Sequence, residues 1–147
     1  MAKTQKNILI TSQVQITTKR LKDLLCCAFE GGSNFWASCS VGQEEMDKVD
    51  AEYFHEIPAL GGEIEMFDKE EVEIAEQDGD EKPKPLGVIN IERIAMALQW
   101  MADGTNEKGK DLPHYKRHFN DIVIENEDAN TGDLLVQLAV MGEEVFG

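Results

Sequence analysis

The sequence predicts an α+β fold in a single domain that spans residues 1–147. Alternation of apolar and polar side chains with the two-residue period of strands recurs in the first half, whereas residues 90–147 carry the 3.6-residue apolar period of helices. Because strands and helices do not alternate regularly, we expect an antiparallel sheet of about four strands with helices packed on one face and a helical C-terminal half. At 147 residues, 41% of them hydrophobic, the chain can bury one substantial core.

The strand signals lie mainly before residue 90. The alternating segment 8–16 predicts a first strand, and segment 35–41 predicts a second. Acidic and apolar residues alternate in 63–67 and again in 71–74, so these two segments predict a hairpin with one face in water. A short further strand is expected at 86–89.

Cap residues and apolar faces predict four helices. The first begins at about Lys19 after a threonine cap and carries leucines at helical spacing. The other three are expected in the C-terminal half. Their expected starts are about Lys19, the residue after Asn90, Pro113 and Leu134, with Gly104 and Gly142 closing the second and the last.

A tight turn follows the first helix and is the best candidate for a small-ligand site. Two glycines at this point let a ligand or another backbone come close, and polar side chains with one tryptophan could surround it. The alternative is a helix stop whose polar groups satisfy local backbone while the tryptophan packs in the core. The candidate ligand-binding residues are Glu30, Gly31, Gly32, Ser33, Asn34 and Trp36, with Asp133 from the C-terminal half. Gly31 is expected to have a positive φ.

The negative charge is concentrated in one part of the chain. Of the 29 acidic residues behind the net charge of −15, sixteen fall in residues 43–81, which contain two lysines. Such a field attracts basic protein surfaces and disfavours direct binding to nucleic acid or anionic membrane. These acids could also merely solvate the outer faces of strands in an acidic strand and loop region over 43–85. The candidate partner-binding residues are Glu63, Glu65, Glu71, Glu73 and Glu76.

Two stretches resemble a known group of proteins. Residues Leu24–Trp36, ending in the Gly-Gly turn, and residues Asp128–Gly142 resemble small uncharacterised bacteriophage and prophage proteins that share this turn and a similar C-terminal helix. The matching stretches lie near the two ends of the chain, and the acidic middle has no counterpart. The resemblance implies a viral, non-structural origin and no particular activity.

Metal and cofactor signals are weak. His114, His118 and Asp121 are spaced for one side of a helix, with Asp111 before it, but the spacing lacks the intervening glutamate of zinc-protease helices, and bordering the core explains these residues better. No phosphate-binding Gly-rich loop or nucleophile elbow is present, so we expect no cofactor and have no catalytic set to assign. The cysteines fit small buried hydrophobes.

The location and assembly of the chain can also be predicted. Met1–Lys6 lead into a strand pattern instead of the apolar core of a signal peptide, and no window has the length of a membrane span. We therefore expect a protein of the host bacterial cytoplasm with no membrane association. The apolar pair Val145–Phe146 at the chain end is expected to dock on its own subunit or on a neighbour in a homodimer.

Two function classes remain open. In the first, which we favour, the chain is a non-enzymatic phage accessory protein whose acidic surface imitates nucleic acid and inhibits a host nucleic-acid-processing or defence protein. In the second, the Glu30–Trp36 turn binds or sequesters a small ligand such as a nucleotide, although few basic residues lie near it in the sequence. An enzyme is the third choice.

Overall fold

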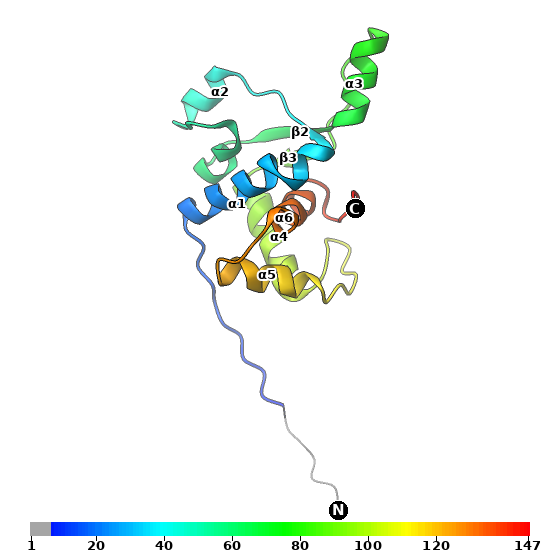
Figure 1. Ribbon diagram of the computed structural model, residues 1–147. Helices are drawn as coiled ribbons and strands as arrows, with labels where there is room; N and C mark the ends of the chain where they lie inside the picture. Colours follow the sequence, from blue (N-terminus) through cyan, green and yellow to red (C-terminus); the bar gives the residue numbers. More distant parts are fainter. Residues whose placement is uncertain (1–6) are drawn as a thin grey trace, which may run out of the picture.

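The computed structural model describes residues 7–147, which form an α+β fold with a helical centre (Figure 1). Its described part contains six α-helices and a small three-stranded antiparallel sheet. The expectation for Met1–Lys6 lies outside the described residues. No helix among the described residues is long and apolar enough to cross a membrane.

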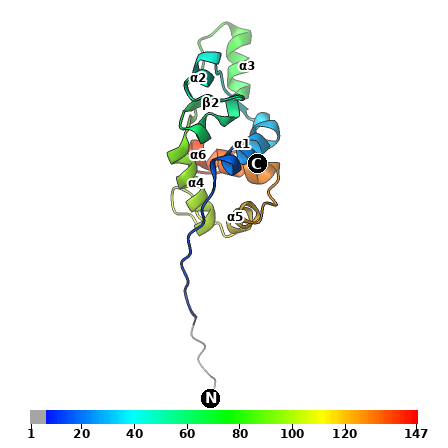
Figure 2. The ribbon, with the colours of Figure 1, turned by 90° about the vertical axis from the view of Figure 1, so that its left-hand side faces the viewer.

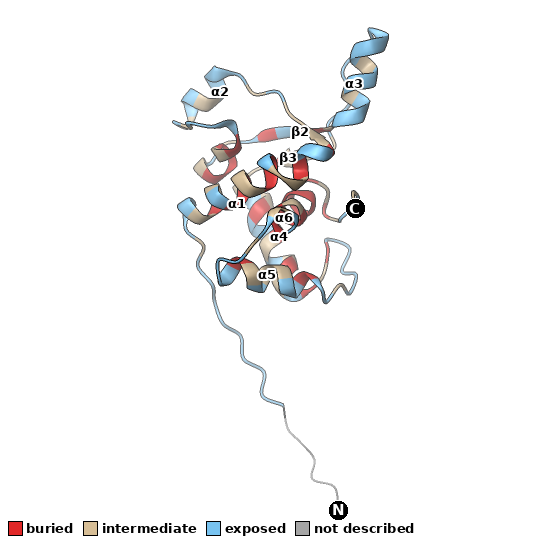
Figure 3. Cartoon of the chain, viewed as in Figure 1, coloured by how far each residue is buried: buried red, intermediate tan, exposed pale blue. Residues whose placement is uncertain are grey.

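Helix α6 (Ala129–Met141) is the centre of the core. Nine of its residues are buried, because helices α1 (Thr18–Glu30) and α4 (Ile91–Asp103) pack around it. Figure 3 shows this burial as a red centre between α1 and α4. Helix α5 (Tyr115–Val123) packs on α4 and joins the same helical group.

The caps explain where the helices begin and end. Thr17 accepts a hydrogen bond from Arg20 N, and Asn90 accepts one from Arg93 N, as their helix-start patterns predict. Helix α6 begins at Ala129, earlier than the predicted Leu134, because the side chain of Asp128 already caps the amide of Thr131. The helix predicted to start at Pro113 is α5, which begins at Tyr115.

The sheet is smaller than predicted. Strand β2 (Ile64–Asp68) pairs on one side with β1 (Ala37–Ser38) and on the other with β3 (Gly87–Ile89), giving the order β1-β2-β3. The strands predicted at 63–67 and 86–89 are therefore confirmed. The strand predicted at 35–41 is confirmed only in its middle, because its start is taken up by the short 3-10 helix η1 (Gly32–Phe35).

Two predicted strands are absent, so the sheet has three strands instead of about four. Residues 7–16 are extended but pair with no strand of the described chain. Residues 71–74 belong to helix α3 (Lys69–Asp78), so the predicted hairpin is wrong. Asp68 caps the amides of Glu70 and Glu71, and this cap lets a run of good helix formers continue helically although its apolar residues alternate.

The chain between the sheet strands β1 and β2 holds short helices only. Helix α2 (Gln43–Lys48) has no buried residue, and the 3-10 helices η2 (Phe54–Glu56) and η3 (Pro58–Leu60) follow it. Helices α2 and α3 lie at one end of the molecule, and the extended N-terminal segment starts at α1 and runs out past the other end (Figures 1 and 2). This arrangement separates the most acidic elements from residues 7–16, which contain no charged side chain.

Candidate functional site

The Gly-Gly turn and the start of α6 meet at a close helix crossing. A Cβ atom added to Gly31 would lie 2.5 Å from Ala129 Cβ, and one added to Gly132 would lie 2.9 Å from Ala28 N. The glycines therefore admit a neighbouring backbone of the same chain. Gly31 has φ −120°, so the predicted positive φ is wrong and the need for glycine here comes from close approach. Gly32 faces Asp133 in the same way.

Asp133 is the polar centre of this crossing. Its Oδ1 accepts hydrogen bonds from Ser33 Oγ at 2.8 Å and from Trp36 Nε1 at 2.7 Å. Its Oδ2 accepts a hydrogen bond at 2.8 Å from Gln137 Nε2, one turn along α6. Ser33 and Gln137 are both 0% exposed, so these partners satisfy groups that water does not reach.

The chain end closes the same network. Gln137 Oε1 accepts hydrogen bonds from the amides of Val145 and Phe146, and its Nε2 also donates to the carbonyl of Phe146. The ring of Phe146 stacks on Trp36 with centroids 4.8 Å apart. Phe146 thus docks on its own chain, which is the first of the two arrangements expected for the terminal apolar pair.

The candidate ligand-binding residues consequently divide into two sets. Ser33, Trp36 and Asp133 are bonded to one another within the core. Glu30 and Asn34 are exposed, and next to them Phe35 has 83% of its surface exposed. The structure brings the turn and the Asp128–Asp133 segment together, and their shared polar atoms are occupied by partners from the same chain.

The histidine candidates have separate surroundings. His118 Nδ1 lies 2.8 Å from Thr131 Oγ1, which also lies 3.2 Å from Asp128 Oδ1 at the cap of α6. His114 is exposed at the start of α5, and Asp121 is half-buried one turn beyond His118. Among the described residues, no group of three or more histidine, cysteine, aspartate or glutamate side chains is placed to hold a metal ion.

The thiols and one ion pair have shifted pKa values. Burial raises the pKa of Cys27 and of Cys39, and nearby carboxylates add to the effect at Cys27, so neither is activated as a nucleophile. Arg20 Nη1 and Nη2 donate to Glu127 at 2.8 and 2.9 Å, and these hydrogen bonds lower the pKa of the Glu127 carboxyl. The pair joins α1 to the loop before α6.

Helix α3 is the most exposed acidic element. It has no buried residue and contacts the strands β1 and β2 near its start, so its remaining length projects from the body (Figures 1 and 3). Even its isoleucine, Ile74, is 50% exposed. The candidate residues Glu71, Glu73 and Glu76 lie on this helix.

The other two candidates, Glu63 and Glu65, lie outside α3, at the start of strand β2. Glu65 is an exposed residue of β2, while Glu63 precedes that strand and accepts a hydrogen bond from Asn90 Nδ2. Among the described residues, one acid of segment 43–81 forms an ion pair: Glu56 Oε2 lies 3.8 Å from Lys22 Nζ. Most carboxylates of the acidic segment therefore have no basic partner in the described chain.

Glu70 and Asp78 also belong to the acidic surface, but a strand predicted over 71–74 does not include them. The signal was present: Asp68 is a good N-cap, two glutamates follow it in the first turn, and Gly79 ends the helix with φ +70°. The strand pattern of Val72 and Ile74 outweighed these cap signals.

The chain was compared with protein-family models, curated proteins and solved structures. No family model matches it, and neither a curated protein nor a solved structure is significantly similar to it.

Proposed function

We propose that this protein binds a basic protein surface through helix α3 and its acidic surroundings. The observation that carries the proposal is an exposed helix with five carboxylates and one lysine that stands clear of the core. A stretch whose apolar residues are not buried contributes little to folding, so its composition is free to serve recognition. The exposed carboxylates of α3 are Glu70, Glu71, Glu73, Glu76 and Asp78.

The charge spacing of α3 resembles that of a nucleic-acid strand. Ten helical residues extend about 15 Å at 1.5 Å per residue, so five carboxylates give about one charge per 3 Å. A single strand of duplex DNA carries one phosphate per roughly 3.4 Å along the axis. A basic groove that tracks phosphates could therefore accept the helix, with long-range attraction that accelerates encounter and weakens with salt.

The partner class follows from this charge and from the resemblance. A basic groove is typical of a protein that handles nucleic acid. The resemblance of the turn and the C-terminal helix to phage proteins supports an accessory protein that acts inside an infected bacterium. We propose inhibition of a host nucleic-acid-processing or defence protein by occupation of that groove. Binding of a small ligand at the Glu30–Trp36 turn is the weaker alternative, because Ser33, Trp36 and Asp133 already bond one another.

The test compares two variants with equal net charge. In the first, Glu70, Glu71, Glu73 and Glu76 are replaced by glutamine. In the second, four exposed acids elsewhere lose their charge through Glu92→Gln, Asp103→Asn, Asp111→Asn and Glu144→Gln. Each protein is immobilised and exposed to bacterial lysate at low and high salt, with and without excess duplex DNA, and captured proteins are identified by mass spectrometry.

The expected result is that the wild type and the second variant retain nucleic-acid-binding proteins, which high salt or DNA releases. The α3 variant should lose this capture while remaining folded, because exposed substitutions usually change stability little. Equal capture by the α3 variant, or capture that DNA does not reduce, would overturn the proposal.

A further inference from the structure

The N-terminal arm, residues 7–16, is an extended segment that leaves most of its apolar side chains in solvent. Ile8, Leu9 and Ile10 are 85%, 94% and 84% exposed, and Val14 is 48% exposed. No backbone hydrogen bond within the described chain involves the arm, so its amide and carbonyl groups form an open strand edge. Such an edge is a template for pairing with another strand.

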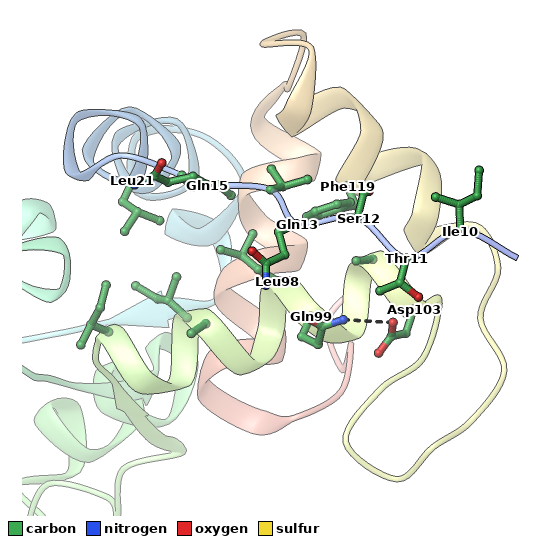
Figure 4. A pocket seen from close by; sticks show the side chains of 16 residues that line it. Ile10, Thr11, Ser12, Gln13, Gln15, Leu21, Leu98, Gln99, Asp103 and Phe119 are labelled. Carbon is green, nitrogen blue, oxygen red and sulfur yellow. Dashed lines mark hydrogen bonds between the residues drawn. The ribbon is translucent and has the colours of Figure 1, made fainter.

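The arm does not fit the groove beside it. Residues 10–16 border a groove of ≈ 1200 Å³ whose opposite wall is α4, with Phe119 of α5 at one side. Figure 4 shows Gln13 directed from the arm toward Leu98 of α4, whereas Ile10 points away from the helix. A polar side chain thus lies over an apolar wall, while Ile8, Leu9 and Ile10 remain in water and Ile16 is the arm residue that packs partly on the core. The apolar wall residues are Ile91, Ile94, Ala95, Leu98, Ala102 and Phe119.

The arm sequence is self-complementary. In a two-fold symmetric antiparallel pair centred on Ser12, Ile8 lies opposite Ile16 of the second copy, and Ile10 lies opposite its Val14. Every apolar residue on this face of the strand therefore meets a β-branched apolar residue, which is a favourable cross-strand pair. A one-residue shift would place these residues on opposite faces of the ribbon. A two-residue shift would keep them on one face but leave Ile8 or Ile16 without an apolar partner, so the register centred on Ser12 pairs the most apolar residues.

Charge also favours a second copy at this place. Residues 7–18 contain no charged residue in a chain whose net charge is −15, and among the residues that the structure describes Asp103 is the one charged side chain lining the groove. Two copies would repel each other through their acidic ends, but the arm runs from α1 away from α2 and α3 and projects past the opposite end of the body (Figure 2). Ten extended residues reach about 33 Å, enough to cross to a neighbour.

We infer that two copies of this chain form a homodimer by pairing their N-terminal arms in an antiparallel ribbon centred on Ser12. A two-stranded ribbon alone is marginally stable, so the ribbon packs its apolar face on the α4 groove. In this arrangement apolar side chains of the ribbon contact Leu98 in place of Gln13. The dimer surface is independent of the acidic helix, so α3 remains free in both copies.

Light scattering on the full chain tests the assembly. The wild type should show twice the 16.5 kDa mass of one chain at high concentration, and Ile10→Asp with Val14→Asp should give the mass of one chain. Ile74→Asp, a charge placed on the exposed isoleucine of α3, should leave the dimer intact. The circular dichroism spectra of both variants should match that of the wild type, because the substituted residues lie outside the core.

Cysteine cross-linking tests the register. Residues facing each other in an antiparallel pair have Cα atoms about 4.5–5.5 Å apart, within disulfide range. Ser12→Cys should give a covalent dimer under mild oxidation. Gln77→Cys on α3 should give no more covalent dimer than the wild type does. A wild type that has the mass of one chain at all concentrations, a dimer that survives both arm substitutions, or Ser12→Cys without cross-linking would overturn the inference.

Discussion

At the scale of residues, Asp133 explains why the turn and the C-terminal helix occur together. Its two oxygens accept hydrogen bonds from Ser33, Trp36 and Gln137. Glycines in the turn and in α6 let the backbones of α1 and α6 approach closely. A carboxylate that accepts several hydrogen bonds is worth more than a neutral acceptor in the same place. The residues that look like a ligand site in the sequence are therefore largely the joint between α1 and α6.

Replacing Asp133 by alanine should destabilise the fold. The substitution leaves the indole N–H of Trp36, which is 6% exposed, without its acceptor, so we expect a loss of about 2–4 kcal/mol in the free energy of unfolding. Urea unfolding measures this loss. Asn34→Ala in the same turn is the control and should change stability by less than about 0.5 kcal/mol, because Asn34 is exposed. Equal stability of both variants would mean that Asp133 does not hold the joint.

Replacing Gly31 by alanine should also destabilise the protein, by about 1–3 kcal/mol, because the added methyl group collides with Ala129. Removing the opposing methyl with Ala129→Gly should restore part of the loss. Chemical denaturation of both single variants and the double variant measures this coupling. Strictly additive effects would show that the two methyl positions do not meet.

At the scale of elements, the helices differ in what holds them. Helix α6 is buried, whereas α3 depends on its cap at Asp68 and on helix-forming residues. Helix α1 is tied to the α6 loop by the Arg20–Glu127 pair, whose side chains are 19% and 10% exposed. A largely buried pair of this kind resists salt better than exposed pairs do.

The Arg20–Glu127 pair predicts an acid-sensitive part of the stability. Hydrogen bonds from Arg20 lower the pKa of Glu127 in the folded protein, although burial opposes this shift. The pair therefore contributes fully above the ordinary glutamate pKa of about 4.3 in the unfolded chain, and its contribution is lost as pH falls through the lower folded-state value.

The measurement is the unfolding free energy of Glu127→Gln across acidic pH. At neutral pH we expect a loss of about 1–3 kcal/mol relative to the wild type, and this gap should narrow as the pH falls below about 4. Glu125→Gln is the matched control, because its side chain also approaches Arg20 but is 69% exposed. A gap that is constant with pH would contradict the assigned linkage.

At the scale of the whole molecule, the core, the acidic end and the arm are separate regions. The core holds α1, α4 and α6 together, and the C-terminal residues return to cover Trp36. The proposed partner helix α3 projects from one end of the molecule, and the arm of the proposed dimer runs out past the other end (Figure 2). One copy could therefore use both at once.

Deleting residues 143–147 should lower the melting temperature without changing the arm-mediated assembly. The deletion removes the ring stacked on Trp36 and three hydrogen bonds of the buried Gln137, so a loss of about 2–4 kcal/mol is expected. Calorimetry and light scattering measure the two effects. Deleting Gly147 alone is the control. An unchanged melting temperature would show that the chain end does not stabilise the core.

Local signals in the sequence determined the helical C-terminal half, the caps at Thr17 and Asn90, and the strand 64–68, because these depend on neighbouring residues alone. The sequence also determined where the negative charge is concentrated. Tertiary structure decided which groups meet: Asp133 lies 97 residues from Trp36 along the chain, and its bonds exist only after α1 crosses α6. It also decided that the alternating segment 8–16 stays unpaired in one chain, since a strand forms only when an edge lies beside it.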